Sequence, residues 1–208
     1  MTGINTTKRT VENLLGIEIN YTVKVGFDTV TELVDALGGV DVYVEPGYAL
    51  NGFLGDKNMS VTEGWNHLNG KQALVYSRER YAYTEGDRQR TKNQQQVVMG
   101  IIDKMTSSSV LANYADLMDA LGDTFQTTMS TSEIQALIQY QMDKMPSWTV
   151  EQYMVDGTGD TLMCAELGQA AYVMVPDQTT VELAKRKIAV VMDGGSSTSI
   201  TSLDNTTE

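Results

Sequence analysis

Apolar residues in the first part of the chain alternate between helical and strand spacing. Positions three or four apart predict helices, and short β-branched runs with period two predict strands. Asp28 stands where a helix N-cap is expected, and glycines follow both helical runs. The predicted elements are a helix over Thr6–Leu15, a strand over 21–27, a helix over Thr29–Leu37 and a strand over 40–44. This order is typical of an α/β sheet domain.

The rest of the chain is less regular. Residues 45–67 contain Pro46 and several glycines without a sustained period, which predicts a long loop. A short helix opening at Asn69 follows over 68–77, and the residues after it are predicted to be extended. The further predicted elements are helices over Asp87–Met105, 110–121, 133–144 and Thr179–Met192, and strands over 148–155 and 171–175. The polar residues 194–208 predict a disordered tail, which leaves one domain over 1–193.

Acidic residues dominate the charge. The 208 residues include 27 acidic and 15 basic ones, for a formal net charge of -12. This balance excludes nonspecific binding to duplex nucleic acid, which needs a broad basic face. Six of the Lys and Arg residues nevertheless fall between Lys71 and Lys92, a stretch called the basic segment below. Such a local concentration suggests a site for an anion.

One row of the helix predicted over Asp87–Met105 begins with polar residues. Arg90 and Gln94 are four residues apart, and the row continues through apolar positions such as Ile101 and Met105. Because a helix buries its apolar row, Arg90 and Gln94 are predicted to point toward the interior. A buried Arg needs an anionic partner, either a carboxylate of the protein or a ligand.

Arg78 and Arg80 are two residues apart, so an extended segment projects both from one face and Glu79 from the other. Guanidinium groups that converge with an amide match a diphosphate, because they donate paired hydrogen bonds and stay charged. The alternative is that these cations pair with Glu79, Glu85 and Asp87 on a solvated face, as runs of charge usually do. Spacing alone indicates an anion site and leaves the reaction open.

Other candidate residues carry less chemistry. Lys71, Arg88 and Lys92 are interpreted as a solvated rim that steers the anion, with Arg88 as a further diphosphate contact. His67, the only histidine, is assigned a structural or surface role, and Cys164, the only cysteine, a packing role.

Two aspartates flank the helix predicted over Thr29–Leu37. Asp28 is explained as a helix cap and Asp41 as a strand end, which favours these roles over metal binding. The sequence contains no Gly-rich nucleotide loop of recognised form.

Three motifs follow one another in a specific order. They read GGVDV at 38–42, LNGKQALVYSRER at 68–80 and DRQRTKNQQ at 87–95. In this order they resemble the LytR-CpsA-Psr family of Gram-positive cell-envelope proteins. The resemblance covers residues 4–105 and continues weakly through 171–177.

The resemblance implies an α/β domain with a central mixed β-sheet flanked by helices on both faces. It implies a phosphotransferase that moves a glycopolymer, such as wall teichoic acid or capsular polysaccharide, from an undecaprenyl diphosphate carrier to peptidoglycan. Arg78, Arg80 and Arg90 match the family's catalytic, diphosphate-binding positions, and Gln94 matches a further diphosphate-binding position. The implied location of the full-length protein is the extracellular face of the cytoplasmic membrane.

Family members also carry an apolar membrane anchor, followed by two aspartates and an arginine that engage Mg²⁺ and the diphosphate, upstream of the matching region. We therefore expect an N-terminally truncated domain, and Mg²⁺ only in a full-length member. The 208 residues of this sequence are not expected to have full activity by themselves. The uncovered sheet is expected to favour a homodimer.

A second hypothesis is a noncatalytic module that binds a polyprenyl phosphate or a glycopolymer. It follows from the absence of the metal-binding aspartates and from the label of transcriptional attenuator given to members of the resembled family. Direct regulation through DNA does not fit the net charge of -12 or the lack of a helix-turn-helix signature.

Overall fold

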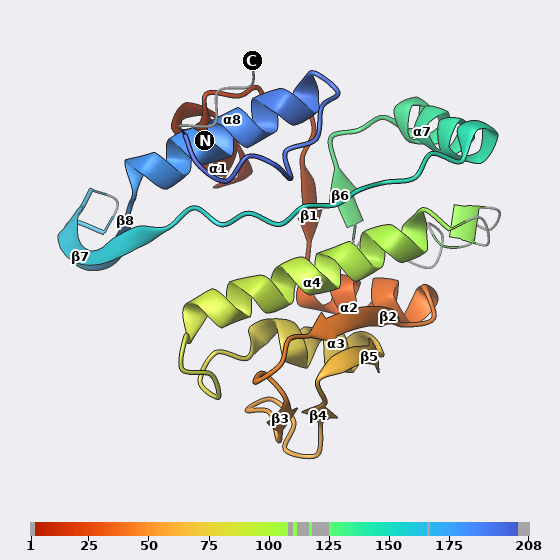
Figure 1. The fold of residues 1–208 in the computed structure, drawn as a ribbon, viewed down its shortest axis with the longest axis horizontal. Helices are drawn as coiled ribbons and strands as arrows, with labels where there is room; N and C mark the ends of the chain where they lie inside the picture. The colour runs from red at the N-terminus through yellow and green to blue at the C-terminus, as the bar shows by residue number, and fades with distance from the viewer. Residues whose placement is uncertain (1–2, 108–109, 112–116, 118–124, 166, 204–208) are drawn as a thin grey trace. The chain divides into compact units, whose positions relative to one another are not determined.

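The chain forms two compact units in the computed structural model (Figure 1). The larger unit is Tyr21–Trp148, and the smaller unit combines Met1–Asn20 with Thr149–Glu208. The sequence predicts one domain over 1–193, whereas the contacts divide the chain into these two parts. The residues that the structure describes are 3–107, 110–111, 117, 125–165 and 167–203.

The larger unit alternates short strands with helices, as expected for the α/β class. Its elements are β1 (Val23–Val25), α2 (Phe27–Ala36), β2 (Val40–Val44), β3 (Leu50–Asn51), β4 (Ser60–Val61), β5 (Gly64–Leu68), α3 (Gly70–Arg78), α4 (Asp87–Met105), β6 (Phe125–Thr127) and α7 (Thr131–Lys144).

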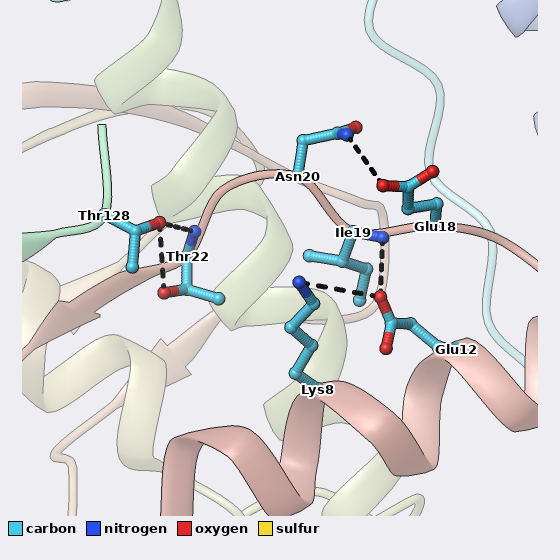
Figure 2. A network of polar contacts seen from close by, with 7 residues as sticks. All are labelled: Lys8, Glu12, Glu18, Ile19, Asn20, Thr22 and Thr128. Atoms are coloured by element: carbon cyan, nitrogen blue, oxygen red, sulfur yellow. Dashed lines mark hydrogen bonds and ion pairs between the residues drawn. The ribbon is translucent and has the colours of Figure 1, made fainter. Parts of the chain in front are cut away.

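Strands of the larger unit pair two by two. β1 pairs with β6, β2 with β5 and β3 with β4, all antiparallel. The β1–β6 pairing is extended by Thr22, whose backbone N–H donates to Oγ1 of Thr128 at 2.8 Å (Figure 2). The α/β class is confirmed, but each strand of the described residues has one hydrogen-bonded neighbour, where we predicted a central mixed sheet.

The core of the larger unit lies on one face of the β2–β5 pair. Val40, Val42 and Val44 of β2 are at most 1% exposed, while the residues between them are less buried. These valines share a core cluster with Tyr76 of α3 and Val97 of α4. The period-two burial confirms the predicted strand over 40–44.

Three strands lie in the region predicted as a long loop. β5 pairs with β2 in a register that runs from Val40 opposite Leu68 to Val44 opposite Gly64. The loop prediction over 45–67 is therefore wrong for β3, β4 and β5. These strands are two to five residues long and depend on partners elsewhere in the chain, so their own sequence carries little period.

Helix α2 begins earlier than predicted. Its N-cap is Gly26, whose backbone N–H donates to Oγ1 of Thr29 at 3.2 Å. Asp28 lies inside the first turn, where a carboxylate is favourable near the helix dipole. The predicted stop is confirmed, because Gly38 and Gly39 adopt φ of 76° and 93°, which residues with a side chain rarely adopt.

Four other helix predictions are confirmed with small changes at the ends. α3 opens after Asn69, which accepts a hydrogen bond from Gln72 N–H, and α4 runs from Asp87 to Met105 as predicted. α7 begins after a Ser130 cap, and the last helix of the chain begins after an Asp177 cap. The helix predicted over 110–121 falls largely outside the described residues.

Two glycines allow close packing around α3 and α4. A Cβ on Gly70, the first residue of α3, would lie 2.1 Å from the carbonyl oxygen of Thr31 in α2. A Cβ on Gly100 of α4 would lie 3.0 Å from the carbonyl oxygen of Asp41 in β2. The basic segment begins in α3 and ends in α4, so both of its ends lie on helices that are packed closely against neighbouring elements.

The smaller unit combines two helices with a long hairpin. Its elements are α1 (Gly3–Leu15), β7 (Gly157–Cys164), β8 (Gln169–Pro176) and α8 (Gln178–Met192), and α1 lies against α8. Near the end of α1, Glu12 accepts a hydrogen bond from the backbone N–H of Ile19 at 2.9 Å and pairs with Lys8 at 3.7 Å (Figure 2). These contacts fix the turn that follows the predicted helix stop at Gly16.

The strand predicted over 148–155 is wrong. Residues 149–156 form neither helix nor strand, and β7 follows them. Gly157 and Gly159 lie in β7, where a Cβ on Gly157 would be 2.5 Å from the carbonyl oxygen of Val175. Glycine marks a close approach between strands here, which sequence alone does not separate from a turn.

Residues 194–203 contact α8, in contrast to the predicted disorder of the tail. Ser197 and Ile200 are buried. Lys187 Nζ donates to the carbonyl oxygen of Ser197 and Arg186 Nη1 to that of Leu203, both at 2.8 Å. Cations of α8 therefore hold this polar segment, and residues 204–208 lie outside the described part.

We expect Gly70→Ala to lower the free energy of unfolding of the larger unit by about 2 kcal/mol or more, because a backbone oxygen cannot move aside as a side chain can. Chemical denaturation measures this loss. Gly26→Ala is the matched control, since its Cβ would meet only Thr29 Oγ1 at 3.5 Å, and it should cost less than about 1 kcal/mol. Equal losses in the two variants would contradict the close approach of α3 to α2.

Candidate functional site

The basic segment joins α3 to α4. Arg78 is the last residue of α3, and Glu79 follows as an extended C-cap with φ of −69° and ψ of 128°. Arg78 and Arg80 are exposed, whereas Glu79 is 3% exposed. Glu79 is thus buried between two exposed arginines, but Arg78 belongs to the helix rather than to the predicted extended run.

Glu79 is a buried carboxylate, and among the described residues its hydrogen-bond donors are backbone N–H groups. Its Oε1 accepts hydrogen bonds from the N–H groups of Arg80, Tyr81 and Ala82 at 3.1, 3.0 and 3.2 Å, and its Oε2 from Leu54 N–H at 2.6 Å. Burial by itself would raise the pKa of this carboxyl, but the donors outweigh burial and lower the pKa below its ordinary value. Sequence reasoning missed this role, because Glu79 resembles an ordinary surface acid.

Both exposed arginines cover an aromatic ring. Arg78 Cζ lies 4.5 Å from the ring centroid of Phe27, and Arg80 Cζ lies 4.8 Å from that of Tyr81. The two rings are themselves 61% and 72% exposed. Stacking on a ring restricts a guanidinium through its face and leaves the in-plane N–H groups available for an anion.

Asp87 brings Arg80 and Arg90 together at the start of α4. Its Oδ1 lies 2.5 Å from Arg90 Nη2 and 4.0 Å from Arg80 Nη1. Within the described residues, Arg90 Nε is buried and has no hydrogen-bond partner. The N-cap Gly86 provides no side-chain acceptor, so the positive end of the helix dipole adds to the two cations.

The buried row of α4 is one position away from the predicted one. Gln89, Asn93 and Val97 are buried, whereas Gln94 is exposed and Arg90 is partly exposed. Asn93 donates to the carbonyl oxygen of Tyr76 at 3.1 Å and accepts from Gln89 Nε2 at 2.9 Å. The prediction that Gln94 points inward is therefore wrong, because the partner that selects the buried row is the end of α3.

The predicted rim is exposed. Lys71, Arg88 and Lys92 all lie on the surface. Lys71 pairs with Asp56 at 3.2 Å, and Lys92 lies 5.7 Å from the ring centroid of Tyr48. These contacts are those of solvated cations near the site.

The alternative of surface ion pairs applies to only part of the segment. Asp87 pairs with Arg90 and approaches Arg80, as that alternative expects. Glu85, however, accepts from the Tyr48 hydroxyl at 2.8 Å, and the two Glu79 oxygens accept from backbone N–H groups. The structure therefore brings Arg80 and Arg90 together, places Arg78 beside Phe27, and leaves Gln94 on the exposed side of α4.

His67 and Asp41 form a separate polar cluster on the β2–β5 pair. Asp41 lies 2.7 Å from His67 Nδ1 and 2.9 Å from Lys104 Nζ. Hydrogen bonds from these two partners, first His67 and then Lys104, lower the pKa of the Asp41 carboxyl. The structural role predicted for His67 agrees with this pairing.

The residues that the structure describes do not fit a Mg²⁺ site. In the part of the chain that the structure describes, no three His, Cys, Asp or Glu side chains are grouped so that they could hold a metal ion. Asp87 is engaged with Arg90, and Asp41 with Lys104. Within the same described residues, no helix has the length and apolar character needed to cross a membrane.

Comparison with known sequences gives one family. The model of the LytR_cpsA_psr family matches residues 1–189. The chain is 33% identical over 151 residues to the polyisoprenyl-teichoic acid–peptidoglycan teichoic acid transferase TagU of Enterococcus faecalis. That match covers 72% of the chain and 47% of the relative, so the chain spans about half the length of this curated relative.

Solved structures share the fold. The chain is 28% identical in sequence to B. subtilis TagV, and its fold matches the TagV crystal structure with a TM-score of 0.71. The match covers 92% of the chain and 71% of TagV. The chain is also 25% identical in sequence to TagT, and its fold matches the structure of TagT bound to LIIa-WTA with a TM-score of 0.68. This match covers 90% of the chain and 67% of TagT. These likenesses support the α/β class established above.

Asn93→Ala is expected to lower the free energy of unfolding by about 2 to 3 kcal/mol, because it leaves the buried Gln89 amide without its acceptor and removes the shorter of two hydrogen bonds to the Tyr76 carbonyl. Urea denaturation measures the loss. Gln94→Ala is the matched control, an amide truncated one position further along the same helix but exposed, and its effect should stay within about 0.5 kcal/mol. A larger loss for Gln94→Ala than for Asn93→Ala would overturn the assigned buried row.

Proposed function

The chain belongs to the LytR_cpsA_psr family, and on that premise we propose that it binds the diphosphate of a polyprenyl-linked glycopolymer through its basic segment. The proposed reaction is transfer of the glycopolymer to peptidoglycan. Arg80 and Arg90 are the principal ligands, with Arg78, Gln94 and Arg88 as further contacts.

The observation that carries the proposal is the meeting of Arg80 and Arg90 around Asp87 at the N-terminus of α4. A diphosphate offers paired oxygens to guanidinium groups and interacts favourably with a helix N-terminus. Support for the glycopolymer comes from the name of the transferase TagU and from the TagT structure bound to LIIa-WTA.

The chemistry is a displacement at phosphorus. A hydroxyl oxygen of peptidoglycan attacks the phosphorus that carries the glycopolymer, and the bond from this phosphorus to the bridging oxygen breaks. A phosphodiester forms, polyprenyl phosphate leaves, and the hydroxyl proton is released to water. Negative charge grows on the bridging oxygen as this bond breaks, and Arg80 and Arg90 stabilise it.

The carrier and the location follow from this reaction. We propose undecaprenyl diphosphate as the carrier and wall teichoic acid or a capsular polysaccharide as the glycopolymer. The acceptor, peptidoglycan, places the reaction at the extracellular face of the cytoplasmic membrane. The lipid chain remains attached to the leaving phosphate.

We expect the chain to bind geranyl diphosphate, and Arg80→Ala and Arg90→Ala each to weaken that binding about tenfold or more, since each removes charge-assisted hydrogen bonds. Isothermal titration calorimetry at fixed salt measures the affinities.

Arg9→Ala is the control for this experiment, because it removes the same charge from α1 of the smaller unit. Its affinity should equal that of the unaltered chain. Equal affinities in all four proteins would contradict the proposed site, and an equal loss in the three variants would indicate attraction by net charge alone.

A further inference from the structure

Glu79 lies between the two exposed arginines of the basic segment and bonds to the backbone around them. Its Oε1 takes three successive N–H groups, those of Arg80, Tyr81 and Ala82. Its Oε2 takes the N–H of Leu54, which precedes β4 in the chain. Successive N–H groups that point at one oxygen form an anion-binding nest, and here the protein's own carboxylate fills it.

We propose that Glu79 is a positioning residue for diphosphate binding, because it fixes the backbone that carries Arg80 and Tyr81. This inference rests on the proposed function and deepens it. Arg80 donates its backbone N–H to Glu79, and its guanidinium lies over the ring of Tyr81, whose N–H is bonded to the same oxygen. Both residues of this stacked pair are thus held at their main chains.

The contribution of Glu79 to affinity comes from the conformational entropy of the backbone between α3 and α4. Arg80 and Tyr81 are exposed and lie outside helices and strands, so without Glu79 their backbone would have to be ordered by the ligand. A residue that is ordered before binding avoids this cost and increases affinity. Glu79 acts through Arg80 in this account and does not touch the diphosphate.

A carboxylate suits this position better than its neutral isostere. Glutamine has one oxygen and one NH₂ group, so it can fill the nest of Arg80, Tyr81 and Ala82 only by turning its NH₂ group toward the N–H of Leu54. One acceptor contact is then replaced by two facing donors. Glu79→Gln is therefore a nearly isosteric change that weakens the tether.

The ionisation of Glu79 agrees with this geometry. Burial raises the pKa of the carboxyl, the backbone donors lower it more, and the net pKa lies below the ordinary value of 4.5. A lowered folded-state pKa contributes stability that is present above 4.5 and lost as the pH falls through the folded-state value. The tether is thus fully charged at neutral pH.

The test is a double-mutant cycle on the affinity for geranyl diphosphate at neutral pH. We expect Glu79→Gln to weaken binding about fivefold or more in the unaltered chain, but less than about twofold when Arg80→Ala is already present. A purely structural role would give the same loss in both backgrounds. Thermal unfolding of each variant confirms that the proteins are folded at the temperature of the titration.

Glu133→Gln is the control, because Glu133 also accepts a backbone N–H, that of Ser130, in the cap of α7. It should leave the affinity unchanged. If Glu79→Gln does not fold, Glu79→Asp replaces it in the cycle, since aspartate keeps the charge but is too short to reach both Leu54 and the nest.

The outcomes separate this inference from the proposed function. Unchanged affinity in Glu79→Gln, or an equal loss in both backgrounds, overturns the positioning role while the diphosphate site stands, provided that Arg90→Ala still weakens binding. An unaltered chain that does not bind geranyl diphosphate overturns both.

Discussion

One buried side chain, the amide of Asn93, connects α4 to α3, the two helices that contain the ends of the basic segment. It satisfies the carbonyl of Tyr76 in the last turn of α3 and also accepts from Gln89 within α4. The same carbonyl accepts a longer hydrogen bond, of 3.4 Å, from the N–H of Glu79 at the C-cap. The Asn93 amide therefore completes the hydrogen bonding at the end of α3. The angular setting of α4, and with it the direction of Arg90, follows from this contact.

Two acidic residues then organise the cations in different ways. Glu79 is buried, and within the described residues its hydrogen bonds come from backbone N–H groups rather than from the guanidinium groups of Arg78 and Arg80. Asp87 is exposed and holds the guanidinium of Arg90 by a direct ion pair. A chain with a net charge of -12 thus keeps a small cationic surface by using nearby acids as structural elements. Positive charge kept close to a helix N-terminus suits the binding of a phosphate group.

The sequence predicts elements well where the signal is local. The bounds of α4 and of β2 follow from periodicity, and the end of α2 follows from Gly38. It fails where the decisive partner is distant. The strand β5 depends on β2, and the strand β7 depends on β8, whose Val175 approaches Gly157 too closely for a side chain.

The candidate site divides in the same way. Residue type and spacing indicate Arg78, Arg80 and Arg90, because guanidinium groups at these intervals already suggest an anion. They do not distinguish Gln94 from Asn93, since apolar residues follow both along α4 and either row could face the core. The Tyr76 carbonyl selects the buried row, and Glu79 is held by the backbone N–H of Leu54, which comes from a different part of the chain. Neither partner can be recognised from the spacing of residues around Asn93 or Glu79.

A crystal structure of the chain with geranyl diphosphate would show directly whether the anion binds at the N-terminus of α4. We predict phosphate oxygens within hydrogen-bonding distance of the guanidinium groups of both Arg80 and Arg90, beside the first turn of α4. A diphosphate bound elsewhere, with Arg80 and Arg90 still paired only with Asp87, would contradict it.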